Sequence, residues 1–191
     1  MGRYRNKLEE AVKEFQPAVE GLFDVSLGNI EYEPFLHFSE NPLADAVYFT
    51  GMNILGGQAP LAQVQCLDWN ASGLGISKSK IQYNNNLWLD ILPKSSIDYI
   101  AVHEMAHLGH ARNVGVEDFF ITSNVMGELF ADYAAHNILG LMKNPRSIIG
   151  LGNRPSEHAV SMDARLKTLG KDFIDYIKNY RKYEPFLLTE S

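Results

Sequence analysis

The stretch from Ser95 to Ala111, which reads SSIDYIAVHEMAHLGHA, decides the fold of this chain. Ser95 and Asp98, three residues later, make a capping box, which satisfies unpaired amides at the start of a helix. Almost every residue that follows is apolar apart from a few histidines and one glutamate. We therefore predict a helix over residues 96–111 that is buried on nearly all sides, with polar groups that need buried partners.

Three of those polar side chains, His103, Glu104 and His107, lie in the segment His103-Glu104-Met105-Ala106-His107. Residues four apart lie one turn above each other on a helix, so His103 and His107 can direct two imidazoles at a single ion. Glu104 lies one step further round, where a carboxylate can take a proton from a metal-bound water. The plainer alternative is a helix that carries two exposed histidines by chance, and the apolar residues around the segment argue against it.

A catalytic zinc ion needs a third protein ligand and one open position. A third histidine six residues after His107 is excluded, because Asn113 stands there. Glu128, near the start of the next predicted helix, is the candidate ligand, since the neighbouring residues are apolar. Asp132 shares its helix face and is expected to accept the outer N–H of a ligating histidine, which fixes the tautomer.

These two segments, 103–107 and 128–132, resemble the paired motifs of gluzincin zinc metallopeptidases. The closest resemblance is to the family of CAAX prenyl endopeptidases and heat-shock-induced membrane proteases, in which Glu-x-x-Ala-Asp follows the histidine motif. It covers about residues 75–170, and the segment from His158 to Arg165 is similar to a further family segment, with Ala159 in place of proline. The family's membrane helices are missing here, so the resemblance implies the zinc chemistry without the membrane substrates.

The function expected from this set is zinc-dependent hydrolysis of peptide bonds. Zn²⁺ would lower the pKa of its bound water, and Glu104 would act as general base and pass the proton to the leaving amine. A donor for the oxyanion is still required; His158 is the first choice, with Arg165 and Tyr133 as alternatives. No cofactor other than Zn²⁺ is expected.

Two other readings remain open. In one, the same residues hold zinc in a non-catalytic interaction or sensing domain; Glu104 argues against it, because a structural site has no use for a general base. In the other, the chain is a metal-free helical domain, which would leave a buried polar cluster without a partner.

The expected fold class is α+β and zincin-like, with a small antiparallel or mixed sheet packed on the active-site helix and a glutamate-bearing helix after it. We expect one domain over residues 1–191, divided into an N-terminal helix and strands (1–75), a catalytic core (76–170) and a C-terminal helix and tail (171–191). The predicted elements are a helix over 3–19 that Pro17 ends or bends, strands at 30–32, 46–50 and 80–83, a long loop over 51–75, a helix from 122–124 to about 141 and a helix over 162–180.

Composition limits the possible partners. The chain has 191 residues and a net charge of −6, which argues against binding nucleic acid or an anionic membrane surface. No export signal or membrane span is visible, and the single cysteine, Cys66, cannot form an internal disulfide, so we expect a cytoplasmic protein. The expected partner is a peptide or protein substrate that adds to a strand edge at residues 76–83.

Overall fold

The computed structural model describes residues 3–34, 62–70, 73–83, 90–122, 125–141 and 157–183. Within these ranges the protein is a mostly helical α+β structure with five helices and one three-stranded mixed sheet. The elements are α1 (Arg3–Phe23), β1 (Glu31–Pro34), β2 (Ala62–Asn70), β3 (Gly73–Tyr83), α4 (Lys94–Thr122), α5 (Val125–Ile138), α6 (Glu157–Leu169) and α7 (Phe173–Tyr183). None of these helices is both long enough and apolar enough to cross a bilayer.

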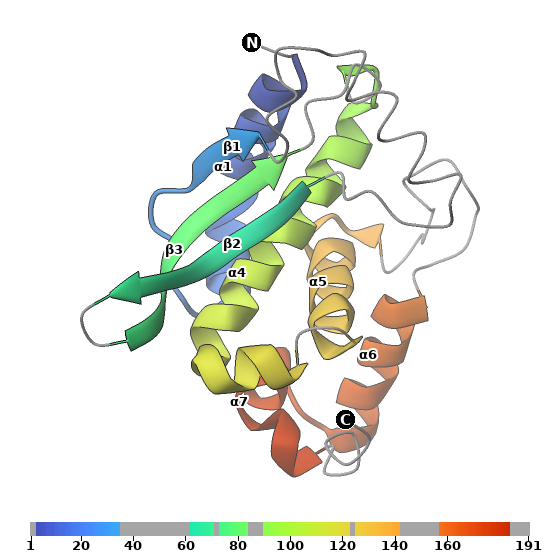
Figure 1. Ribbon diagram of the computed structural model, residues 1–191. Coiled ribbons are helices and arrows are strands. Elements are labelled where there is room, and N and C mark those ends of the chain that lie inside the picture. The colour runs from blue at the N-terminus through green and yellow to red at the C-terminus, as the bar shows by residue number, and fades with distance from the viewer. Residues whose placement is uncertain are drawn as a thin grey trace, which may run out of the picture.

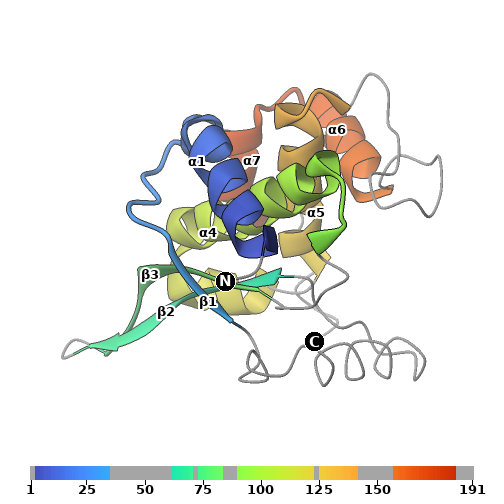
Figure 2. The ribbon, with the colours of Figure 1, turned by 90° about the horizontal axis from the view of Figure 1, so that it is seen from above.

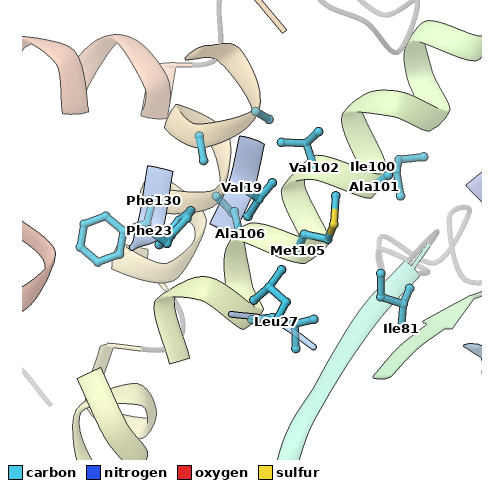
Figure 3. Close-up of a cluster of buried hydrophobic side chains, with 14 of the residues drawn as sticks. Val19, Phe23, Leu27, Ile81, Ile100, Ala101, Val102, Met105, Ala106 and Phe130 are labelled. Carbon is cyan, nitrogen blue, oxygen red and sulfur yellow. The ribbon is translucent and has the colours of Figure 1, made fainter. Parts of the chain in front are cut away.

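Helix α4 is the centre of the molecule. It runs between the sheet on one side and α1 and α7 on the other, with α5 alongside (Figures 1 and 2). Its side chains meet those of α1, α5 and β3 in one apolar cluster (Figure 3). The predicted burial of this helix is confirmed by its fully or nearly fully buried residues, which are Ile97, Ile100, Ala101, Val102, Met105, Ala106, Leu108 and Ala111.

Helix α4 extends beyond both ends of the predicted helix over 96–111. The helix begins at Lys94, which lies four residues after Asp90 and two residues before the predicted start. At this end the Ile97 amide donates a hydrogen bond to the Pro93 carbonyl at 3.3 Å. Gly115 interrupts it with φ 78° and ψ 177°, a conformation that only glycine adopts readily. Helical geometry then resumes up to Thr122, which the sequence pattern did not predict.

Pro17 is predicted to end or bend the helix over 3–19, and the first alternative is excluded because α1 continues past it to Phe23. An interior proline costs about 3 kcal/mol because it removes a hydrogen bond and crowds the preceding turn. Val19 and Phe23 extend the apolar stripe beyond Pro17, and both are fully buried. Burial of these two side chains offsets the proline, and Pro17 itself is exposed.

The sheet has the strand order β1-β3-β2, with β1 parallel and β2 antiparallel to β3. The strand predicted at 80–83 is confirmed as the end of β3, and that at 30–32 overlaps β1. The strand predicted at 46–50 lies outside the described residues. The registers are Tyr32↔Ile81 between β1 and β3, and Val64↔Ile81 between β2 and β3 with a shift between Gln65 and Leu67.

Two predictions about this sheet are wrong. The loop expected over 51–75 contains all of β2 and the start of β3. The alternating run Ala62-Gln63-Val64-Gln65 forms a strand because it pairs with β3, and that pairing outweighs the local turn signals. The expected edge strand at 76–83 belongs to β3, which lies between the other two strands. The antiparallel edge of the described sheet is therefore β2.

The helix predicted over 162–180 corresponds to two helices in the structure, α6 and α7. Gly170 adopts φ 62°, and the Lys171 amide donates to the Leu166 carbonyl at 3.1 Å, which is the hydrogen bond of a Schellman end. Asp172 then caps α7, because its Oδ1 accepts the Asp175 amide at 2.7 Å. The glycine and aspartate signals were present in the sequence, but the continuous apolar period concealed them.

Gly109 of α4 packs directly against Phe23 at the end of α1. A Cβ atom there would lie 2.7 Å from Cγ of Phe23 and 3.1 Å from its Cβ. Phe23 cannot move away easily, since it is fully buried and its ring meets Phe173 edge-on at 5.2 Å.

We therefore expect Gly109→Ala to destabilise the protein by about 1–3 kcal/mol through overpacking. Gly21→Ala is the matched control, because no atom lies within 4 Å of its added Cβ; it should stabilise α1 by up to about 1 kcal/mol. Thermal unfolding measures both changes. Equal stabilisation by the two substitutions would contradict the close approach.

Candidate metal centre

His103, His107 and Glu128 come together between α4 and α5 and can bind a metal ion. His103 Nε2 lies 3.2 Å from His107 Nε2 and 3.2 Å from Glu128 Oε2. His107 Nε2 lies 3.4 Å from Glu128 Oε1. In the part of the chain that the structure describes, this is the set of histidine, cysteine or acidic side chains whose ligand atoms converge within 4.8 Å.

Local sequence explains why these helices meet at this place. The two histidines project from one face of α4, as the four-residue spacing requires. Glu128 lies in the first turn of α5, and small side chains at Ala131 and Ala135 are fully buried. Small residues on a packed face let two helix backbones approach closely, which brings Glu128 within reach of both imidazoles.

We call the set of His103, His107 and Glu128 the metal group. Asp132 lies beside it on α5, one turn beyond Glu128. Its Oδ1 lies 3.1 Å from His103 Nδ1 and accepts the Tyr99 hydroxyl at 2.6 Å. Its Oδ2 lies 3.0 Å from His158 Nδ1. The expected contact between Asp132 and a ligating histidine is thus present, although the His103 N–H does not point straight at the oxygen.

Two carboxylates face the His103 ring, Asp132 at Nδ1 and Glu128 at Nε2, and each can only accept a hydrogen bond. If a metal ion took the place of the proton on Nε2, Asp132 would favour the remaining proton on Nδ1. Burial lowers the pKa of His103, but the contacts with Asp132 and Glu128 outweigh it and raise the pKa to about 10. The two carboxylates therefore make this imidazole a favourable place for positive charge.

Glu128 is the complementary charge. Contacts with His103 and then His107 hold its pKa well below the usual range, despite partial burial. Its side chain is 47% exposed, whereas the two histidine side chains are 16% and 13% exposed. The metal group is consequently walled by α4 on one side and open to solvent at the carboxylate.

Glu104 lies beside the group without joining the converging ligand atoms. It is only 8% exposed. Burial raises the pKa of its carboxyl, and the neighbouring His103 and His107 partly oppose that rise. The structure therefore buries this carboxyl at a place where the charges of both histidines act on it.

The other histidines that the structure describes, His110, His136 and His158, have different surroundings. His158, expected in a loop, lies in the first turn of α6, where its side chain is 51% exposed. His110 is fully buried and meets Phe130 edge-on at 4.7 Å, so it has no surface role, and burial followed by the charge of His107 lowers its pKa to about 3. His136 Nδ1 donates to the Asp132 main-chain carbonyl at 2.8 Å and takes no part in the metal group.

Tyr99 is the residue of this region that sequence analysis missed. Besides donating to Asp132, its ring stacks on His103, with centroids 5.9 Å apart and an angle of 26° between planes. The available signal was its position four residues before His103, on the same helix face. A tyrosine in an apolar helix is usually a core residue, so spacing alone did not separate the two roles.

Comparison of the chain with protein-family models, curated protein sequences and solved structures finds no significant match. The function is therefore inferred from the chemistry of the site itself.

Proposed function

We propose that this chain is a zinc metallopeptidase of the gluzincin type, which hydrolyses peptide bonds with Glu104 as general base. The observation that carries the proposal is the buried Glu104 carboxyl beside a convergent His103, His107 and Glu128 group. A metal group and an adjacent proton acceptor are the two parts that metal-assisted hydrolysis requires.

The donor set supports zinc as the ion. Zinc binds imidazole nitrogen and carboxylate oxygen at about 2.0–2.2 Å in tetrahedral geometry, which separates neighbouring ligand atoms by about 3.3–3.6 Å. The two histidine Nε2 atoms lie 3.2 Å apart, and Glu128 places Oε2 3.2 Å from His103 Nε2 and Oε1 3.4 Å from His107 Nε2. All three side chains can therefore reach one ion of this size with little movement.

The number of ligands favours catalysis over a structural role. Structural zinc sites are closed by four protein ligands, whereas catalytic sites use three and keep one position open. Among the described residues the group offers two histidines and one glutamate. The half-exposed Glu128 is also consistent with access for a substrate.

The residues would divide the reaction between them. Zinc in such a site lowers the pKa of a water ligand and polarises the carbonyl of the substrate. Glu104 accepts the proton of the attacking water and passes it to the leaving amine. His158, which shares Asp132 with His103, is the candidate donor to the oxyanion because its exposed ring lies next to the site.

The substrate proposed is a peptide in an extended conformation that pairs with the outer edge of β2. Main-chain hydrogen bonds to a strand edge recognise a peptide largely without regard to its side chains. Strand β2 packs against α4 and has β3 on only one side among the described strands. It replaces residues 76–83 as the docking edge.

The test is metal analysis of the purified protein together with hydrolysis of a broad peptide library. We expect one zinc per chain, loss of hydrolysis after treatment with a chelator and recovery after zinc is added back. Zinc without hydrolysis would favour the non-catalytic zinc domain. Absence of zinc from protein purified without chelators would contradict both.

A further inference from the structure

We infer that Tyr99 is a positioning residue that locks Asp132 against His103 and thereby strengthens metal binding by the His103, His107 and Glu128 group. The inference rests on the proposed metal centre, and extends it to a residue outside the converging His103, His107 and Glu128 group. It follows from three sets of contacts around the Tyr99 side chain.

The first contact is the short hydrogen bond from the Tyr99 hydroxyl to Asp132 Oδ1, 2.6 Å long. The Asp132 side chain is only 14% exposed, so water competes weakly for that oxygen. Hydrogen bonds to a charged acceptor are stronger than those between neutral groups, and burial strengthens them further. The hydroxyl is therefore well placed to fix the rotation of the carboxylate.

The second contact is between the rings of Tyr99 and His103, which stack at 5.9 Å. His103 also depends on Asp132 Oδ1, but its N–H does not point straight at that oxygen. The Tyr99 hydroxyl is thus better aligned as a donor to Oδ1 than His103 Nδ1 is. Without it, Oδ1 would lose this donor while Oδ2 keeps its contact with His158 at 3.0 Å, so the carboxylate would be held less firmly in the orientation that faces His103.

The third contact anchors Tyr99 to α5. The ring of His136 meets the Tyr99 ring at 90° and 5.5 Å, while its Nδ1 donates to the Asp132 main-chain carbonyl. Tyr99 shares α4 with both histidine ligands, and Asp132 shares α5 with Glu128. The hydrogen bond from Tyr99 to Asp132 therefore ties the two ligand-bearing helices together beside the metal group.

The test compares Tyr99→Phe with Tyr183→Phe. Each substitution deletes one tyrosine hydroxyl that donates to an aspartate, because the Tyr183 hydroxyl donates to Asp175 at 3.1 Å on α7. Partners of metal ligands change affinity by roughly 10–100-fold, so we expect Tyr99→Phe to weaken zinc binding roughly tenfold in competition with a chromophoric chelator. Tyr183→Phe should leave zinc affinity unchanged. Equal affinities of wild type and Tyr99→Phe would overturn the inference, even if both variants unfold at lower temperature.

A second measurement tests the route through Asp132. In an Asp132→Ala background, Tyr99→Phe should weaken zinc binding less than twofold. The visible spectrum of Co²⁺ bound in place of zinc should change with Tyr99→Phe when Asp132 is present, and should not change when Asp132 is replaced. A tenfold loss in that background would overturn a route through Asp132. Because zinc affinity is measured without substrate, a protein that binds zinc but hydrolyses nothing would refute the peptidase and leave Tyr99 in its role. A wild type that binds no zinc would overturn both.

Discussion

Glu104→Gln is expected to lower kcat/KM for peptide hydrolysis by roughly 10²- to 10⁴-fold, the contribution typical of a general base. Glutamine has the same shape but cannot accept the proton of the attacking water. The folded state should not suffer, because a neutral amide is easier to bury than a carboxylate, and Glu104 is only 8% exposed. Zinc content should stay at the wild-type value, since Glu104 is not among the converging ligand atoms.

The control for this substitution is Glu10→Gln, which makes the same chemical change at an exposed position on α1. Zinc content, far-UV circular dichroism and peptide hydrolysis are measured on all three proteins. If the activity of Glu104→Gln fell by less than about tenfold, the loss would be smaller than that expected for removal of a general base, and Glu104 would not be the base. The hydrolysis would then have to come from another group or from a contaminating protease.

Glu128→Ala should cause the largest loss of metal. Four-ligand structural zinc sites bind with about 10–16 kcal/mol, which is roughly 2.5–4 kcal/mol per ligand, so removal of one ligand should weaken binding by roughly 10²- to 10³-fold. Hydrolysis should fall together with zinc content, unlike in Glu104→Gln. Isothermal titration with zinc measures the affinity directly.

Glu157→Ala is the matched control for Glu128→Ala. Both glutamates lie in the first turn of a helix, so both substitutions remove the same favourable interaction with the helix dipole. Only Glu128 faces the two histidines. If the two variants bound zinc with equal affinity, Glu128 would not be a ligand and the proposed centre would need another third residue.

Much of the candidate site was predictable because its geometry is local. A four-residue spacing places His103 and His107 on one face of the first helix, whatever the rest of the chain does. The same spacing places Glu128 and Asp132 on one face of the next helix. The apolar residues around the first pair predicted a buried helix, and the structure confirms it. Tyr99 escaped notice because a hydroxyl on an apolar helix gains a functional meaning only when its acceptor, 33 residues away, is known.

The failures have the opposite character, since each depends on a partner distant in the sequence. Burial of Val19 and Phe23 against other helices carries α1 past Pro17. Pairing with β3 makes a strand of residues 62–70, and the position of β3 between β1 and β2 leaves those two strands, not residues 76–83, at the edges of the described sheet. The break between α6 and α7 is the exception, because the Gly170 and Asp172 signals were local and a continuous apolar period outweighed them.

The sequence by itself thus determined the buried helix, its pair of histidines and the second helix with Glu128 and Asp132, because helical periodicity acts over a few residues. Only the tertiary structure decided that His103, His107 and Glu128 converge, that Tyr99 and His158 share Asp132, and which strand lies at the edge of the sheet. Those features depend on the packing of α4 against α5 and on strand pairing, in which contacts between segments far apart in the chain outweigh local preference.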